Sequence, residues 1–206
     1  MPIANYEVRP LFAVPYFRTD ISSAITPEQV RWIDALPMVK NQINLISENL
    51  YIFEAPEMRS IKEAVEEALA LYASEVMGIE HKLYVTQSWA LINPPGIGMH
   101  GHSHSNSLVS GSLYYRDLPS PPSRMIFERH NNYQLLELGS VAAKANIYNA
   151  ARNAIEPKQG DLVLFSSALS HFVEANQASE ARHSIAFNTF IKGKIGSYRD
   201  VSELTL

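Results

Sequence analysis

From Lys82 onward, short apolar runs alternate with clusters of proline, glycine, serine and asparagine. Runs of this length, bounded by turn-forming residues, are typical of β-strands. A series of them at this spacing favours a sandwich or a barrel. The pattern predicts strands over residues 83–93, 108–116, 124–128, 146–149, 161–165 and 184–191.

The part of the chain before these runs carries helical signals. Residues 26–29 (Thr-Pro-Glu-Gln) combine a capping box with a proline at the first helical position, which predicts a helix that ends at about Pro37. A second predicted helix covers about residues 56–77, because its apolar residues recur at three- and four-residue intervals and Gly78 follows it.

The chain of 206 residues has the length of one domain with a full hydrophobic core. Helices gathered before a run of strands suggest a β core with helices packed outside it. We therefore expect a single domain over residues 1–206 that is mainly β with flanking helices. Its helical N-terminal support would cover about residues 1–80 and its β core about residues 82–192.

The chain contains no cysteine. This absence excludes a disulfide scaffold, a cysteine-ligated zinc site, an iron–sulfur cluster and a thiol nucleophile. Any bound metal must therefore be held by histidine, carboxylate or amide groups.

Charge and hydropathy narrow the range of partners. The formal net charge is −4 and the basic residues are scattered, so we expect no nucleic acid partner. The N-terminus lacks the basic start and apolar run of a signal peptide, and no stretch approaches the roughly 18 apolar residues of a membrane span. We expect a cytoplasmic protein without membrane contact, and the sequence is compatible with a homodimer without defining the oligomeric state.

Three of the seven histidines lie within residues 96–104 (Gly-Ile-Gly-Met-His-Gly-His-Ser-His). Alternate residues of a strand face the same side, so His102 and His104 are predicted to project together and to bind one metal ion. His100 shares the alternation but lies closest to the preceding Pro-Pro-Gly turn, which favours a place in the pocket wall or behind the ligands. Two alternatives stay open, namely a surface loop without an ion and binding by His100 instead of His104.

A further histidine follows a predicted buried strand. His171 lies among apolar residues after the run 160–165 (Gly-Asp-Leu-Val-Leu-Phe). A lone histidine in such a place is more often a hydrogen-bonded core residue. The paired histidines upstream favour metal ligation by His171 instead, and three protein ligands would leave open positions on the ion.

Arg182 follows His171 by eleven residues and begins a segment with period two. Ile185, Phe187 and Ile191 fall on one face of the predicted strand, and Arg182, Ser184, Ala186 and Asn188 fall on the other. A polar face of this kind usually meets water, but here it is predicted to line a pocket. A guanidinium pairs bidentately with a carboxylate, and a neighbouring hydroxyl adds one hydrogen bond. Arg182 and Ser184 are therefore predicted to bind a carboxylate group.

The combination of His102-x-His104, a distal His171 and Arg182-x-Ser184 resembles the Fe(II)/2-oxoglutarate-dependent oxygenase superfamily, specifically its prolyl-hydroxylase-like branch. Within this branch the chain is similar to bacterial and phage proteins with a His-x-His motif, most of which are uncharacterised. The resemblance implies a double-stranded β-helix, or jelly roll, as the core of the fold.

The resemblance covers about residues 85–192 and also implies a function. The chain would be a dioxygenase that hydroxylates an unidentified small-molecule, peptide or protein substrate and releases succinate and CO2. Fe(II) would be held by the three histidines, and the co-substrate 2-oxoglutarate by Arg182 and Ser184. Tyr115 matches the strand tyrosine that donates to the same carboxylate in the family.

One position departs from the family pattern. His104 stands where the family usually has an aspartate or glutamate, so the ligand set is less negative by one charge. This departure leaves the identity of the metal open. Asn106 or the carboxylate of Glu174 are candidates to compensate.

Two other interpretations remain. A cupin would share the jelly roll and the histidines without needing 2-oxoglutarate, but Leu108 and Val109 stand where cupins usually have a glutamate. A non-catalytic jelly-roll binding protein would hold a structural ion or none. Trp89 and Asn93 are predicted to shape the pocket, and the loops 94–100 and 130–134 to select the substrate.

Overall fold

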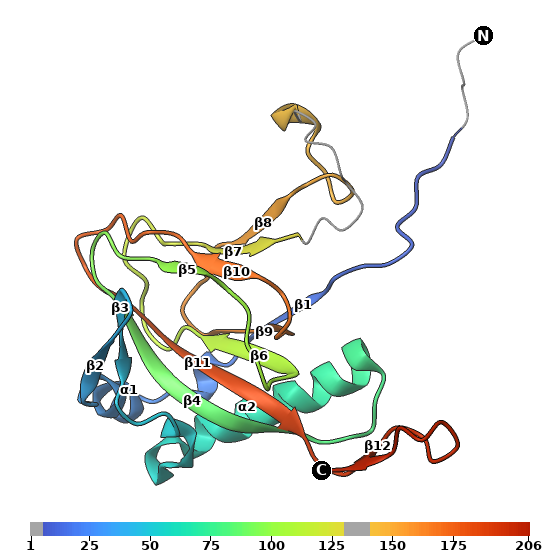
Figure 1. Cartoon of the computed structure of the whole chain (residues 1–206). Coiled ribbons are helices and arrows are strands. Elements are labelled where there is room, and N and C mark those ends of the chain that lie inside the picture. The colour runs from blue at the N-terminus through green and yellow to red at the C-terminus, as the bar shows by residue number, and fades with distance from the viewer. Residues whose placement is uncertain (1–5, 130–140) are drawn as a thin grey trace.

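A computed structural model describes residues 6–129 and 141–206 of the chain. Two antiparallel sheets lie face to face, with the helices below the larger one in Figure 1. The larger sheet has seven strands in the order β1-β9-β6-β11-β4-β3-β2, and the smaller has four in the order β5-β10-β7-β8. The strands of the larger sheet are β1 Tyr16–Asp20, β2 Met38–Asn41, β3 Asn44–Ser47, β4 Leu83–Asn93, β6 Val109–Leu113, β9 Asp161–Ser166 and β11 Arg182–Ile191. Those of the smaller sheet are β5 Met99–His102, β7 Met125–Glu128, β8 Arg152–Ile155 and β10 His171–Val173.

The chain crosses repeatedly between the two sheets. It leaves β4 in the larger sheet for β5 in the smaller, returns to β6, forms β7 and β8, and then passes through β9 and β10 to β11. This winding makes a double-stranded β-helix, so the predicted fold class is confirmed. A short hairpin of β12 Lys194–Ile195 and β13 Leu204–Thr205 follows the core.

The two predicted helices are present. Helix α1 spans Pro27–Asp34 and has the predicted capping box, in which the Thr26 hydroxyl accepts from the Gln29 backbone and the Gln29 side chain accepts from the Thr26 backbone. Helix α2 spans Arg59–Leu71, continues as a π-helical turn over Tyr72–Met77 and ends at Gly78, whose φ of 64° is the left-handed conformation that glycine adopts freely. Short 3-10 turns cover Ser22–Ala24, Ile52–Glu54, Pro56–Met58 and Ala142–Lys144.

Strand β11 separates two environments because its side chains alternate. Ile185 and Phe187 are fully buried in the main core, together with Ile61 and Leu69 of α2. On the opposite face, Arg182 and its alternate neighbours point into the space between the sheets. The predicted two-faced strand is therefore confirmed, and a register irregularity between Asn188 and Thr189 accounts for the break in its pattern.

Two expectations about secondary structure are wrong. Residues 146–149 form a turn instead of a strand, because the Asn146 side chain accepts a hydrogen bond from the Tyr148 backbone at 2.8 Å. The first 80 residues are not purely a helical support, since they supply β1, β2 and β3 to the larger sheet. No helix within the described residues combines the length and the apolar character needed to cross a membrane.

Candidate metal centre

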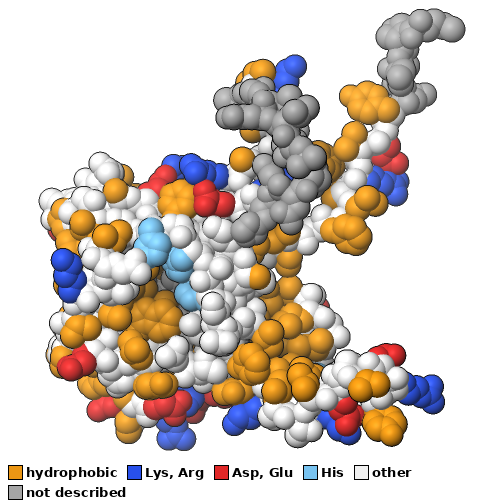
Figure 2. Space-filling view, in the orientation of Figure 1, with side chains coloured by type: hydrophobic (Ala, Val, Ile, Leu, Met, Phe, Trp, Pro, Cys, Tyr) orange, Lys and Arg blue, Asp and Glu red, His pale blue; other side chains and the backbone are white. Residues whose placement is uncertain are grey.

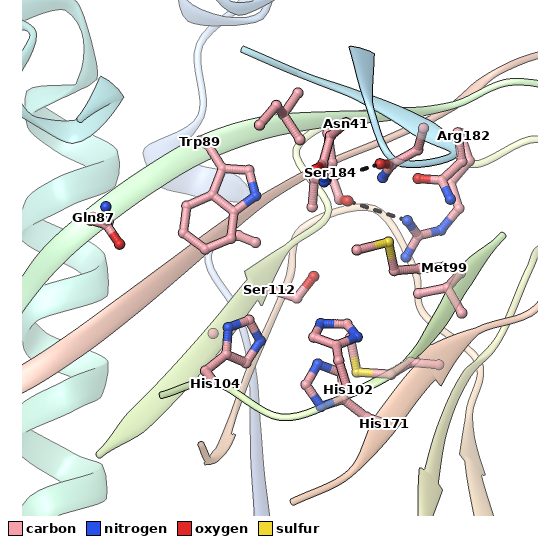
Figure 3. A pocket seen from close by; sticks show the side chains of 18 of the residues that line it. Asn41, Gln87, Trp89, Met99, His102, His104, Ser112, His171, Arg182 and Ser184 are labelled. Carbon is pink, nitrogen blue, oxygen red and sulfur yellow. Dashed lines mark hydrogen bonds between the residues drawn. The ribbon is translucent and has the colours of Figure 1, made fainter. Parts of the chain in front are cut away.

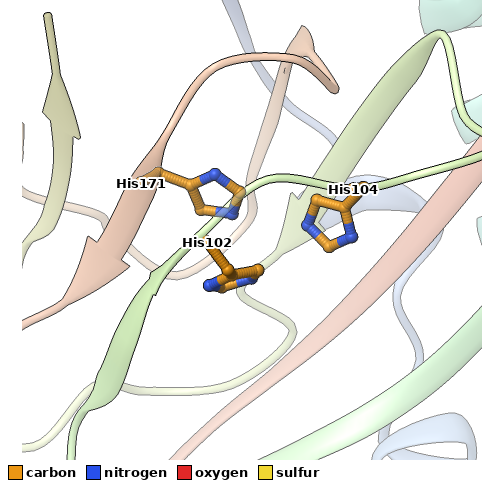
Figure 4. Close-up of side chains that lie close together, drawn as sticks. All are labelled: His102, His104 and His171. Carbon is orange, nitrogen blue, oxygen red and sulfur yellow. The ribbon is translucent and has the colours of Figure 1, made fainter. Parts of the chain in front are cut away.

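Three imidazoles meet at one end of the space between the sheets (Figure 4). His102, the last residue of β5, lies directly opposite His171, the first residue of β10, and their ring centroids are 4.4 Å apart. His104 completes the group, with its ring centroid 5.2 Å from that of His171. The candidate ligand atoms of the three side chains all lie within 4.8 Å of one another. The structure thus brings together the three histidines that were predicted as ligands.

The route by which His104 reaches the site differs from the prediction. Strand β5 ends at His102, so His104 lies in the following turn and not on the same strand. Its backbone N–H donates to the carbonyl of Ser167 at 2.9 Å, which ties the turn to the segment that leads into β10. The Ser167 hydroxyl in turn donates to Ser107 at 2.7 Å on the far side of the turn. The turn carrying His104 is therefore held from both sides.

His100 lies outside the cluster. Its side chain is exposed and is absent from the group of candidate ligand atoms. Its backbone carbonyl, however, accepts a hydrogen bond from Nδ1 of His102 at 2.8 Å. His100 thus supports the ligand next to it through its backbone.

The hydrogen bonds of the rings determine which nitrogen is free. Nδ1 of His171 donates to the carbonyl of Leu169 at 2.9 Å, just as Nδ1 of His102 donates to His100. A carbonyl oxygen only accepts, so in both neutral rings the proton is on Nδ1 and the lone pair is on Nε2. Metal-binding histidines are commonly oriented by a backbone carbonyl in this way.

The protonation state also suits a metal site. Burial, followed by the repulsion of the neighbouring rings, lowers the pKa of His104 to about 4. Burial lowers the pKa of His171 to about 4 as well, with a smaller contribution from His102, whose own pKa is lowered by burial. The rings are therefore neutral at pH 7, the form that binds metals. Nitrogens bound to one ion at about 2.1 Å lie about 3 Å apart, so modest side-chain rotations would let these rings hold a first-row cation.

No carboxylate of the described chain joins this group. The carboxylate of Glu174, a candidate to compensate for His104, accepts a hydrogen bond from Nε of Arg124 at 2.8 Å instead. Asn106 has a positive φ of 55° in the same turn as His104, is exposed and does not line the cavity. The site within residues 6–129 and 141–206 therefore consists of three neutral imidazoles.

The imidazoles border a cavity of about 290 Å³ between the sheets. In Figure 3 the histidines lie at the lower end of this cavity, Trp89 and Gln87 lie to one side, and Arg182 lies at the upper right. Figure 2 shows histidine side chains at the molecular surface beside a hydrophobic area. Of the three clustered histidines, His171 is buried and the other two are half-buried. Trp89 and Asn93 line the cavity as predicted. From the loop 94–100 Met99 lines it, whereas the loop 130–134 lies outside the described residues.

Arg182 is buried at the far end of the cavity with only 2% of its surface exposed. Nη1 donates to the Ser184 hydroxyl and Nη2 to the Tyr114 hydroxyl, both at 3.2 Å. The guanidinium carbon lies 5.0 Å from the centre of the Tyr114 ring. Nε has no hydrogen-bond partner among the described residues. The guanidinium is thus positioned by neutral groups alone.

The expected role of Tyr115 is wrong. Its hydroxyl donates to the carboxylate of Asp34 at 2.9 Å and lies 3.2 Å from Nδ1 of His183, on the helix side of the larger sheet. The tyrosine beside Arg182 is its neighbour, Tyr114. Successive residues of an extended chain face opposite sides. Ser112 pairs with Ala186 and lines the cavity with it, so Tyr114, two residues further on, faces the cavity side as well, and Tyr115 faces the helices.

Comparison with known proteins agrees with this arrangement. Residues 87–188, about half of the chain, match a family model described as "Putative 2OG-Fe(II) oxygenase". Among curated proteins none matches the sequence.

Several solved structures share the fold. A prolyl-4-hydroxylase from Pseudomonas putida has a TM-score of 0.59 and 17% identity, covering 87% of this chain and 94% of that one. An oxidoreductase of the 2OG-Fe(II) oxygenase family from Burkholderia pseudomallei has a TM-score of 0.60 and 9% identity, covering 84% and 83%. HygX from Streptomyces hygroscopicus, solved with nickel and 2-oxoglutarate bound, has a TM-score of 0.60 and 13% identity, covering 85% and 82%.

The matched segment contains all three histidines and the buried arginine, and it coincides with most of the double-stranded β-helix. The family match also decides between the interpretations left open, since it favours the oxygenase over the cupin. The chain belongs to the 2OG-Fe(II) oxygenase family, whose members are oxidoreductases that use Fe(II) and 2-oxoglutarate.

Proposed function

We propose that this chain is a dioxygenase that hydroxylates its substrate with dioxygen and converts 2-oxoglutarate to succinate and CO2. His102, His104 and His171 would hold Fe(II). Arg182, with Ser184, would hold the carboxylate of 2-oxoglutarate remote from its 2-oxo group, here called the distal carboxylate.

The observation that carries the proposal is the burial of Arg182 without a counter-ion. Within the described residues, its guanidinium donates hydrogen bonds only to the hydroxyls of Ser184 and Tyr114, and no carboxylate pairs with it. Burying a cation costs several kcal/mol unless an anion and hydrogen bonds compensate. A carboxylate at the inner end of the same cavity as three metal-ligating imidazoles would supply that compensation.

When bound, Fe(II) would supply the activation of dioxygen and 2-oxoglutarate the electrons for the oxidation. The residues of the chain provide position and exclusion of water. The hydrogen bonds to the carbonyls of His100 and Leu169 fix two of the ligand rings. Phe165 packs against His171 with ring centroids 4.7 Å apart and so covers one side of this ligand ring.

The remaining cavity wall suggests the character of the substrate. Arg182 is the one formally charged side chain among the described residues that line the cavity, and the rest are apolar or neutral amides, hydroxyls and imidazoles. If 2-oxoglutarate neutralises Arg182, an additional charge would lack a partner there. We therefore propose that the reacting group of the substrate is uncharged.

Replacement of Arg182 by glutamine tests the proposal. Anaerobic addition of 2-oxoglutarate to the Fe(II)-loaded wild type should give a weak visible charge-transfer band. Arg182→Gln should lose the band and bind 2-oxoglutarate about 100-fold more weakly, because charge-assisted bidentate contacts are lost. Fe(II) binding itself should persist in this variant.

Arg124→Gln is the matched control, because Arg124 is paired with Glu174 on the surface, away from the cavity. It should behave like the wild type. Absence of the band in the wild type would reject the proposed use of 2-oxoglutarate. A normal band in Arg182→Gln would instead reject the role given to Arg182.

A further inference from the structure

We infer that Asn44, on the hairpin formed by β2 and β3, is a further positioning residue for 2-oxoglutarate and donates a hydrogen bond from Nδ2 to its distal carboxylate. This inference rests on the proposed function of Arg182. It gives the N-terminal hairpin, which lies outside the segment matched by the family model, a direct part in binding the co-substrate.

Asn44 is buried and has an unused donor. It lines the cavity with only 1% of its surface exposed. Its Oδ1 accepts from Nδ2 of Asn41 at the other end of the hairpin turn, at 3.5 Å. Nδ2 of Asn44 has no hydrogen-bond partner among the described residues. A buried amide nitrogen without an acceptor is costly, so a ligand oxygen is its expected partner.

The register of the larger sheet brings this donor to the side of Arg182. Strand β3 pairs with β4 through Leu45 opposite Ile92, and one further step along the antiparallel ladder sets Asn44 beside Asn93. Asn93 pairs with Arg182 on its other side. Residues opposite one another on neighbouring strands share a face, so Asn44, Asn93 and Arg182 form one row that faces the cavity.

The middle residue of this row is already engaged. Nδ2 of Asn93 donates to the carbonyl of Gly98 at 2.8 Å. The unpartnered nitrogens, Nδ2 of Asn44 and Nε of Arg182, therefore belong to the two outer residues of the row. Their strands are about 10 Å apart at two strand spacings, a gap that the two side chains and one carboxylate can fill.

The position of Asn44 within the cavity indicates that its partner is the co-substrate and not the substrate. In Figure 3 Asn41, Ser184 and Arg182 lie together at the end opposite the three imidazoles. The oxidised group of the substrate must lie near the metal, whereas the distal carboxylate lies at the arginine end. A carboxylate accepts several hydrogen bonds, so it can take one from Asn44 in addition to those from Arg182 and Ser184.

The test compares the affinities for two 2-oxo acids. Zinc-loaded protein is titrated by calorimetry with 2-oxoglutarate and with 2-oxobutyrate, which lacks the distal carboxylate. Asn44→Ala should weaken 2-oxoglutarate binding about 5- to 10-fold, as expected for one hydrogen bond to a charged group, and leave 2-oxobutyrate binding unchanged. Asn44→Asp, which replaces the donor with a negative acceptor, should weaken 2-oxoglutarate binding at least several-fold further.

Gln42→Glu is the matched control. Gln42 lies in the same hairpin turn as Asn44, but it is exposed and does not line the cavity. This variant adds the same charge and should retain wild-type affinity for 2-oxoglutarate. Asn44→Ser replaces Asn44→Asp if the latter does not fold, as judged by circular dichroism, and should lose affinity as Asn44→Ala does.

Three results would overturn the inference. They are wild-type affinity in Asn44→Ala, equal losses of 2-oxoglutarate and 2-oxobutyrate binding, and equal losses in Asn44→Asp and Gln42→Glu. Failure of the wild type to bind 2-oxoglutarate at all is a different outcome, because it would reject the proposed function itself.

Discussion

His102 and His171 face each other across the antiparallel pair of β5 and β10, with ring centroids 4.4 Å apart. Because both strands belong to the smaller sheet, backbone hydrogen bonds hold the two ligands at this separation before any ion binds. Such preorganisation lowers the conformational cost of metal binding. His104 depends instead on the turn after β5.

Removal of one ligand should therefore abolish tight metal binding. His171→Ala leaves two imidazoles, so we expect the affinity of the variant for Co²⁺ or Zn²⁺ to be about 100-fold lower or more. This loss is larger than the usual effect of removing a group that only orients a ligand. His100→Ala should bind metal as the wild type does, because His100 contributes its backbone carbonyl and its side chain is exposed. Competition with a chromophoric chelator measures both affinities, and a similar loss in the two variants would disprove the assignment of the ligands.

The lowered pKa values of the ligands predict a stability change with pH in the metal-free protein. His104 and His171 have pKa values of about 4 in the folded chain, mainly because of burial. In the unfolded chain histidine titrates near 6.5, so between pH of about 6.5 and about 4 the unfolded state binds protons that the folded state does not. The free energy of unfolding should therefore decrease as the pH is lowered through this window, by at most about 1.4 kcal/mol per pH unit for each of the two groups.

Urea denaturation of the metal-free protein at pH 7, 6 and 5 measures this effect. Carboxylates contribute to the same titration, so the comparison is made with the double variant His104→Gln/His171→Gln. Its free energy of unfolding should depend less on pH over this range than that of the wild type. Parallel curves for the two proteins would show that these imidazoles are not buried in the neutral form.

The neighbouring tyrosines give a matched pair of variants for the carboxylate site. Tyr114→Phe removes the hydroxyl that accepts from Arg182, and we expect 2-oxoglutarate affinity to fall about 3- to 10-fold as the guanidinium loses one of its two anchors. Tyr115→Phe removes the hydrogen bond to Asp34 instead, so it should leave that affinity unchanged and lower stability by about 1 kcal/mol. Calorimetric titration and thermal unfolding of both variants separate the two roles, and the reverse pattern would restore Tyr115 to the site.

The two tyrosines also show which parts of the carboxylate site could be predicted from the sequence and which could not. The face of Arg182 and Ser184 was predictable because β11 alternates over many residues between apolar and polar side chains. Assigning Tyr114 required the register between β6 and β11, which depends on long-range pairing and is not encoded in one strand.

Other parts of the site were hidden for similar reasons. Strands β5 and β10 have only four and three residues, too few for a periodic signal, so their pairing appears only in the structure. The ligands were predictable because histidine pairs of this kind are rare and chemically specific. Asn44 gave no signal, because an asparagine in a hairpin is usually explained by the turn alone.

Gly111 offers a test of the core packing between β6 and β11, the two neighbouring strands that line the cavity with their other faces. It lies opposite Phe187 on β11, and a Cβ added to Gly111 would fall on the Phe187 ring. Glycine normally weakens a strand, so alanine would usually stabilise it. Here we expect Gly111→Ala to lower the free energy of unfolding by about 1–3 kcal/mol, because the added methyl overpacks the core. In a double-mutant cycle, Phe187→Leu should recover part of that loss by making room, whereas strictly additive effects would show that the ring does not restrict position 111.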